Sequence, residues 1–239
     1  MTDVTPDLRG PSPLAPGVWH VEGRLRLSPG IHFPVRSTLV DTGEGLALVS
    51  PLGFDDETAA RIDALGAVTF LVAPNLFHHL FLEAATARWP EAKVLAPPGL
   101  RSKRPGLTID GDPSSLPGVE VHRVAGMPKL EEHALFHRPS GTLVVTDLVF
   151  NMHRAHTGLT RFILKYVSRA YGRVAVSGLL RWLTKDRPAA AASLDAILAL
   201  PFERLVMAHG DVVEEDARAQ LAAATLALRG KPAAPALLA

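Results

Sequence analysis

The residues of this sequence that could do chemistry stand where apolar, strand-like runs end. Strand ends place side chains at the rim of a sheet, and loops held there often carry function. Imidazoles and carboxylates together suit zinc, iron or manganese. The sequence has no cysteine, so a transition metal would need His, Asp or Glu ligands. The candidates that follow or end such runs are His78, His79, Asp147, His209 and Asp41.

Each of these residues also has a structural explanation. A lone histidine near a strand end is more often a hydrogen-bonded structural residue than a ligand, and an aspartate there is commonly a turn residue or a helix N-cap. The sequence lacks HExxH, GxGxxG, the P-loop pattern and GxSxG, which are the short motifs of zincins, nucleotide sites and serine hydrolases. Spacing alone therefore leaves a metal site and a structural role open.

The composition is that of a globular protein. Of 239 residues, 47% are hydrophobic and 21% charged, and the formal net charge is +1. Lys and Arg are spread along the chain, so nucleic-acid binding is not expected. No apolar run is long enough to span a bilayer, and residues 1–17 lack the apolar core of a secretory signal. We expect one cytoplasmic domain over residues 1–239, with a loose Pro- and Gly-rich arm at 1–17 and a fraying tail at 230–239.

Hairpins and βα units alternate along the chain. Residues 36–51 contain two apolar runs around the turn Thr42–Gly45, which predicts a hairpin. Strands are further predicted at 18–23, 67–74 and 92–98, in three segments within 119–150 that include a turn at 139–141, and at 204–210. Helices are predicted at 55–66, 80–89, 160–183, 191–200 and 214–228. This mixture predicts an α/β protein in which two mixed sheets pack together with helices outside.

The order of these motifs resembles that of the metallo-β-lactamase superfamily over roughly residues 18–215. The segments that carry the resemblance are, in chain order, STLVDTGEGLALVSP, LVAPNLFHHLFL, VAGMPKLEEHALFH, LVVTDLVF and LVMAHGD. It rests on the order and the strand context of the motifs. It implies a four-layer αββα sandwich of two mixed sheets, and the metal-dependent hydrolysis that this fold often supports.

Compared residue by residue, the resemblance is partial. The family loop HxHxDH has its two leading histidines at Pro74 and Leu76 here, and the mid-chain histidine falls near Met127 or Pro128. In the family these three histidines hold one metal. The ligands of the second metal are matched, with the motif aspartate replaced by His78. The resemblance therefore implies one divalent ion, zinc or alternatively iron or manganese, with the ligands His78, His79, Asp147 and His209.

The implied activity is that of a hydrolase with one metal, whose bound water attacks an ester, thioester, lactone or phosphoester of a small molecule. Asp211 or Glu132 could orient a histidine or take a proton, although we prefer to regard both as solvated surface acids. Asn75 and Asn151 could donate to an oxyanion or shape turns. The alternative function is a non-catalytic binding protein, either without metal or with a structural one.

Residues 154–188 lie between the third and fourth motifs and combine basic with large apolar side chains. We expect a helical insertion that packs onto the sheet. A lid over the site, a homodimer surface and contact with an anionic membrane are further interpretations. Two glycines, Gly172 and Gly178, argue against one long helix on a surface.

Overall fold

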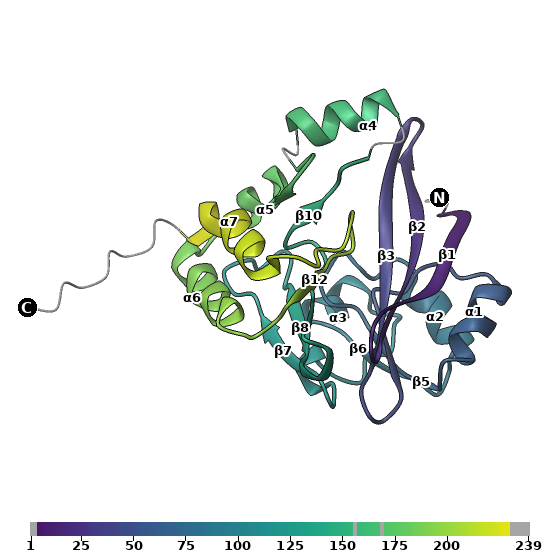
Figure 1. The fold of residues 1–239 in the computed structure, drawn as a ribbon. Helices are drawn as coiled ribbons and strands as arrows, with labels where there is room; N and C mark the ends of the chain where they lie inside the picture. The colour runs from purple at the N-terminus through teal and green to yellow at the C-terminus, as the bar shows by residue number, and fades with distance from the viewer. Residues whose placement is uncertain (1–3, 155–156, 168–169, 230–239) are drawn as a thin grey trace, which may run out of the picture.

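The computed structural model describes residues 4–154, 157–167 and 170–229 (Figure 1). Its larger sheet has six strands in the order β1-β2-β3-β4-β5-β6. Strands β1 to β4 pair antiparallel, while β4, β5 and β6 run parallel. The bounds are β1 Val4–Ala15, β2 Val18–Ser28, β3 Ile31–Asp41, β4 Leu46–Val49, β5 Val68–Val72 and β6 Lys93–Leu95.

The second sheet has four strands in the order β12-β9-β8-β7, and β12 runs parallel to β9. Its bounds are β7 Glu120–Arg123, β8 His133–His137, β9 Thr142–Val144 and β12 Arg204–Val206, and a separate two-stranded ribbon joins β10 Phe150–Asn151 to β11 Val174–Ala175. The helices are α1 Asp56–Asp63, α2 Leu82–Arg88, α3 Gly99–Lys103, α4 Gly158–Phe162, α5 Gly178–Leu183, α6 Arg187–Leu198 and α7 Ala217–Arg229. A π-helical turn, Ile163–Val167, continues α4.

Alternating side chains build three apolar layers, because successive residues of a strand point to opposite faces. In β4, Leu46 and Leu48 pack toward α1 and α2, whereas Ala47 and Val49 face the second sheet. In the second sheet, Val144 and Val206 face the first sheet, and their neighbours pack under α6 and α7. Figure 1 shows these helix pairs on opposite outer sides. The molecule is thus the predicted αββα sandwich of two mixed sheets.

The prediction of a loose arm at residues 1–17 is wrong, because Val4–Ala15 form the edge strand β1. Three prolines in this stretch suggested irregular chain. Proline is tolerated on an edge strand, where its missing N–H can face away from the ladder. The pairing of β1 with β2 also shifts register at three places, which fits the prolines. The predicted tail at 230–239 lies outside the described residues.

The helix predicted over residues 160–183 is interrupted. Helix α4 and its π-turn end by Val167, the short strand β11 follows, and α5 begins at Gly178. Gly172 has φ +80°, a conformation that glycine adopts without strain, and it precedes the strand. No helix among the described residues is long and apolar enough to cross a membrane.

Candidate metal centre

Three loops that follow parallel strands bring the predicted residues together. Strands β9 and β12 are parallel neighbours in which Val144 pairs with Val206. Asp147 and His209 each come three residues after that pair, so both lie at the same edge of the second sheet. His78 comes from the loop after β5, which is a strand of the first sheet. The site therefore lies between the two sheets, at the carboxyl ends of their parallel strands.

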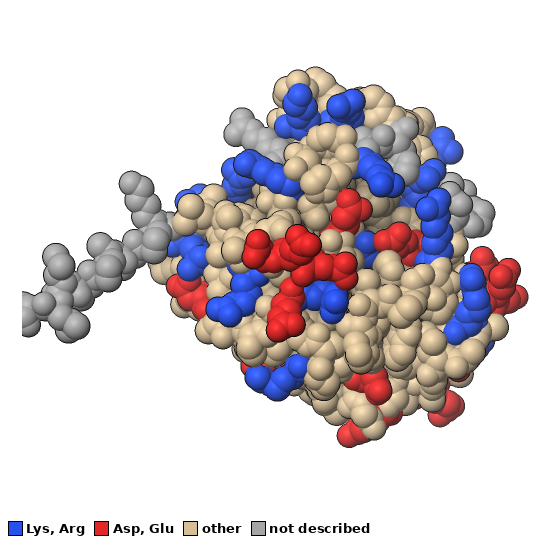
Figure 2. Space-filling view, viewed as in Figure 1, with Lys and Arg blue, Asp and Glu red and all other residues tan. Residues whose placement is uncertain are grey.

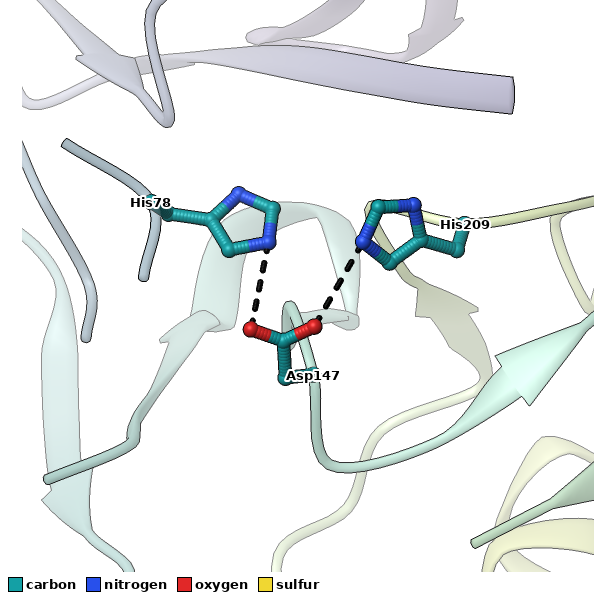
Figure 3. Close-up of side chains that lie close together, drawn as sticks. All are labelled: His78, Asp147 and His209. Atoms are coloured by element: carbon teal, nitrogen blue, oxygen red, sulfur yellow. Dashed lines mark ion pairs between the residues drawn. The ribbon is translucent and has the colours of Figure 1, made fainter. Parts of the chain in front are cut away.

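His78, Asp147 and His209 form one cluster, with ligand atoms that all lie within 4.8 Å of one another. Nε2 of His78 is 3.3 Å from Oδ2 of Asp147, and Nε2 of His209 is 3.4 Å from Oδ1. Figure 3 shows both rings pointing at the carboxylate. These separations exceed the roughly 2.7–2.9 Å of a charge-assisted hydrogen bond. They match the edge, about 3.3 Å, of a tetrahedron of ligands around zinc.

The chain fixes which nitrogen of His209 faces Asp147. Nδ1 lies 2.8 Å from the carbonyl oxygen of Pro34, which can only accept, so Nδ1 carries a proton. In the neutral ring, Nε2 therefore presents a lone pair to a carboxylate oxygen. Two acceptors at 3.4 Å need a proton or a cation between them. Phe33 and Phe150 pack edge-on against the ring and hold this orientation.

His78 is held in a similar way. Its Nδ1 lies 2.6 Å from the hydroxyl of Ser50, directly after β4, and its backbone N–H donates to Oδ1 of Asn75 at 2.8 Å. Ser50 has φ 55°, which is unusual for a non-glycine residue and is typical of positions where the surrounding structure imposes the conformation. Sequence reasoning missed Ser50, although the same signal, a polar residue at the end of an apolar strand, marks it.

A buried network supports Asp147 from below. The Asn75 side-chain amide donates to Oδ2 of Asp147 at 2.9 Å and to Oε2 of Glu132 at 2.6 Å. Oε1 of Glu132 accepts the backbone N–H and the hydroxyl of Thr146. Glu132 is fully buried, so our preferred interpretation of it as a solvated surface acid is wrong. Asn75 does shape a turn, because its Oδ1 accepts two backbone N–H groups.

Charges in this region perturb one another. Burial and, to a smaller extent, the nearby Asp147 carboxylate together raise the pKa of Glu132 to about 7. Burial disfavours ionised Asp147, but His78 and His209 outweigh it and hold the pKa of Asp147 well below its usual range. For His78, burial opposes the charged ring, yet Asp147 prevails and the pKa is raised. Asp147 is thus an anion that favours positive charge at His78.

His79, which the resemblance implied as a ligand, lies outside the cluster. Its Nδ1 is 3.3 Å from the guanidinium of Arg104, which can only donate, so the ring serves as an acceptor there. Burial and the positive charges of Lys103 and Arg104 lower its pKa to about 4. Adjacent residues in the turn before α2 point in different directions, and this separates His79 from His78.

The remaining candidates are placed apart from the cluster. Asp41 ends β3 at the opposite end from Pro34, and its carboxylate caps a turn at Gly43. Asp211 is exposed, as preferred from the sequence. Asn151 donates to the backbone oxygen of Asp211 and accepts from His153, so it stabilises the loop after His209. None of these contacts reaches the cluster.

An apolar cavity of about 370 Å³ opens over the cluster. Its polar lining includes His78, Asp147, His209 and Ser50. The rest is largely aliphatic and aromatic, with contributions from the β2–β3 hairpin, the loop after β4, the His78 loop and α5, namely Leu25, Phe33, Leu52, Phe77, Phe81 and Leu179. Such a cavity, with a few convergent polar groups at its floor, is the usual form of a small-molecule site.

No protein-family model and no curated protein matches this sequence. Solved structures do match. A metallo-β-lactamase from Pontibacter korlensis has a TM-score of 0.61 at 14% identity, covering 97% of this chain and 100% of that one. The metallo-β-lactamase FIM-1 from Pseudomonas aeruginosa, in its mono-zinc form, has 0.58 at 17%, covering 95% and 94%.

The flavodiiron core of Flv1 from Synechocystis sp. PCC6803, in a metal-soaked structure, has a TM-score of 0.62 at 12% identity. The match covers 95% of this chain and 61% of that one. Proteins of different chemistry thus share this architecture, and at such low identity the likeness speaks for the fold and not for an activity. Together with the two sheets and their outer helices, these likenesses establish that this chain has the metallo-β-lactamase fold.

Proposed function

We propose that this protein is a hydrolase that uses one divalent metal ion, zinc in the first instance, held by His78, Asp147 and His209. Two imidazoles and a carboxylate are a ligand set that catalytic zinc sites use, with a fourth position left for water. Such an ion lowers the pKa of a bound water toward ~7 and polarises a carbonyl or phosphoryl oxygen. The substrate class is an ester, thioester, lactone or phosphoester.

The observation that carries the proposal is the orientation of His209. Its Nδ1 donates to the Pro34 carbonyl, so in the neutral ring the lone pair of Nε2 faces the Asp147 carboxylate at 3.4 Å. A cation held by both residues would satisfy both acceptors. Histidines that ligate metals commonly donate their other N–H to a carbonyl or carboxylate, as His209 does.

The residues around the cluster support its use as a reaction site. Asn75 fixes the Asp147 carboxylate through Oδ2, and Ser50 fixes the ring of His78. The largely apolar walls of the cavity lower the local dielectric constant, which strengthens electrostatic interactions at its floor. The sequence suggested two acids for proton transfer. Asp211 is exposed and lies away from the cluster, and Glu132 is a buried structural group. We therefore assign neither a catalytic role.

Metal analysis tests the metal half of the proposal. Protein purified without chelators should carry about one equivalent of zinc, and His209→Ala and Asp147→Ala should carry almost none. His79→Ala is the matched control, because it removes a buried imidazole next to His78 but outside the cluster, and it should keep its metal. Wild-type protein without metal, or equal loss in all three variants, would overturn the assignment.

Activity tests the hydrolase half. Apo-protein and zinc-reloaded protein are compared on aryl esters, thioesters, lactones and phosphodiesters. We expect zinc-dependent turnover of at least one class, lost in His209→Ala and kept in His79→Ala. A protein that binds one zinc at this cluster but hydrolyses none of these substrates above the apo level would be a metal-binding protein without this activity.

A further inference from the structure

We propose that the face formed by α4, its π-turn and α5 docks on an anionic lipid bilayer, from which the cavity takes the apolar chain of an amphiphilic substrate. Hereafter this surface is called the α4–α5 face. The proposal that this face docks on a bilayer is argued from surface residues alone. The proposed substrate rests on the proposed function. The two parts can therefore fail separately.

Exposed apolar side chains concentrate on this face and on the adjoining rim of the cavity. Nine large hydrophobic residues are exposed in the described chain. All but Leu65 and Leu226 belong to this region, namely Phe77, Leu80, Leu159, Phe162, Tyr166, Leu179 and Trp182. Trp182 is 62% exposed and Tyr166 is 59% exposed. A concentrated exposed apolar surface marks an interaction site.

These side chains connect to the cavity. Leu179, Phe77 and Leu80 line it, and Trp182 lies three residues after Leu179, on the same side of α5. The rings of Phe162 and Tyr166 lie 5.1 Å apart.

Helix α4 is attached to the tip of the hairpin that forms another cavity wall, because the His32 backbone N–H donates to the Thr160 hydroxyl at 3.1 Å. Figure 1 shows α4 beginning beside this tip and running across the top of the molecule toward α5.

The charge of the region selects the partner. Between Asp147 and Asp186 the sequence has no acidic residue and seven basic ones, namely Arg154, Arg161, Lys165, Arg169, Arg173, Arg181 and Lys185. In Figure 2, Lys and Arg side chains surround the tan surface at the α4 end, and acidic side chains lie mainly below it.

Lys165 lies over the Tyr166 ring, and Lys185 over the Trp182 ring at 4.5 Å. Tryptophan and tyrosine favour the membrane–water interface, and basic residues favour anionic head groups.

A second copy of the chain fits this face less well. A symmetric dimer places the same patch of each subunit against the other, so the basic residues of the two copies would meet with no acidic partner from this region. Like charges brought together oppose association. An anionic lipid surface satisfies both the basic and the apolar side chains.

The test is co-sedimentation of the full-length protein with vesicles of phosphatidylcholine, with or without phosphatidylglycerol. We expect binding to the anionic vesicles that weakens at high salt. Arg161→Gln with Lys165→Gln should weaken it about 25-fold, at about fivefold per charge, and Trp182→Ser should weaken it too. Arg61→Gln and Leu65→Ser remove an exposed charge and an exposed leucine at α1, and should bind as wild type does.

Other outcomes overturn the docking proposal. One is equal binding, or no binding, to neutral and anionic vesicles. Another is that Phe162→Ser and Trp182→Ser convert a dimer to a monomer in ultracentrifugation while vesicle binding is unchanged. In that case the α4–α5 face joins two copies of the chain.

Two readouts separate docking from the metal centre. His209→Ala leaves the face intact and should still bind anionic vesicles. For the substrate, zinc-loaded protein is given esters of increasing acyl length, and kcat/KM should rise about fourfold per methylene while the chain fits the cavity. Vesicle binding without any dependence on chain length would overturn the substrate assignment and leave the docking in place.

Discussion

Two groups of polar residues meet beneath the cavity, and they differ in what balances their charge. In the cluster of His78, Asp147 and His209, an oriented lone pair faces a carboxylate and the cavity is open above it. Around Glu132, the chain itself supplies the donors, from Asn75 and Thr146. A buried carboxylate such as that of Glu132 needs no metal, because internal donors already satisfy it. Facing acceptors are the better mark of a cation site.

The sequence resemblance matched a second set of positions to another metal, and these positions lie among packed side chains and closed backbone hydrogen bonds. Leu76 and Met127 lie in hydrophobic cores. The Pro74 carbonyl accepts the backbone N–H of His133 at 2.9 Å, and the Leu76 N–H donates to Leu130 at 2.8 Å. These positions have apolar side chains and closed backbone hydrogen bonds. The two halves of the motif that the sequence resembles thus differ in structure as they do in sequence.

The substitution Asp147→Asn, in the cluster with His78 and His209, should have the largest effect on zinc binding. The amide keeps the shape of the side chain but loses the charge that two imidazoles share. We expect zinc affinity to fall by at least about a hundredfold, more than the loss typical of outer partners. Competition with a fluorescent chelator measures it. Asp211→Asn changes an exposed acid two residues from His209 and should alter the affinity by less than about twofold; comparable losses in both would mean that bulk charge holds the ion.

A substitution in the hydrogen-bonded group around Glu132 should lower the free energy of unfolding and leave the metal content unchanged. In Glu132→Gln, one carboxylate oxygen becomes an NH2 group, which must face the donor of Asn75 or of Thr146. We expect a loss of about 1–3 kcal/mol in the free energy of unfolding, measured with urea on metal-free protein. Glu44→Gln, in an exposed turn, should change it by less than about 0.5 kcal/mol. A Glu132→Gln protein of normal stability that lost its zinc would reverse the two roles.

His79, which lies outside the cluster, should make the free energy of unfolding depend on pH. Its pKa is about 4 in the folded protein, below the ordinary value of about 6.5 in the unfolded chain. Between these values the unfolded chain binds the extra proton, so stability falls as pH falls. This loss should reach up to about 2 kcal/mol at pH 5 relative to pH 7. His79→Gln should reduce the pH dependence of urea unfolding in metal-free protein; an unchanged slope would contradict the assigned environment.

The smallest effect is expected at Ser50, whose hydroxyl contacts the ring of His78. Ser50→Ala removes the hydroxyl that lies 2.6 Å from Nδ1, so the ring is less well oriented. Zinc affinity should fall about tenfold, as is usual for an outer partner of a ligand. Ser140→Ala removes a similar contact, 2.7 Å from Nδ1 of His137, outside the cluster, and should leave affinity unchanged. Equal affinity in both variants would remove Ser50 from the site.

Much of the fold could be predicted from the sequence because its signals are local. The hairpin turn at Thr42–Gly45 and the acidic first turn of α1 determine their elements within a few residues. The edge strand β1 could not be predicted, because its pairing with β2 overrides the prolines that suggest loose chain. The break before α5 was underestimated for a related reason, since β11 is stabilised by its partner β10.

The site was predictable in part. His78, Asp147 and His209 each follow a strand, and the order of these strands brought them together. Whether His79 joins them depends on the direction of two adjacent side chains in one turn, and no spacing rule determines it. The burial of Glu132 is likewise a property of packing, because the donors that satisfy it, from Asn75 and Thr146, come from other parts of the chain.

Anomalous diffraction at the zinc edge, from crystals grown with zinc, tests the central claim most directly. We expect one strong peak within bonding distance of Nε2 of His78, Nε2 of His209 and the Asp147 carboxylate, with the Asn75–Glu132 network free of metal. Absence of a peak at the cluster, ligation by His79, or a second peak beside Glu132 would contradict it.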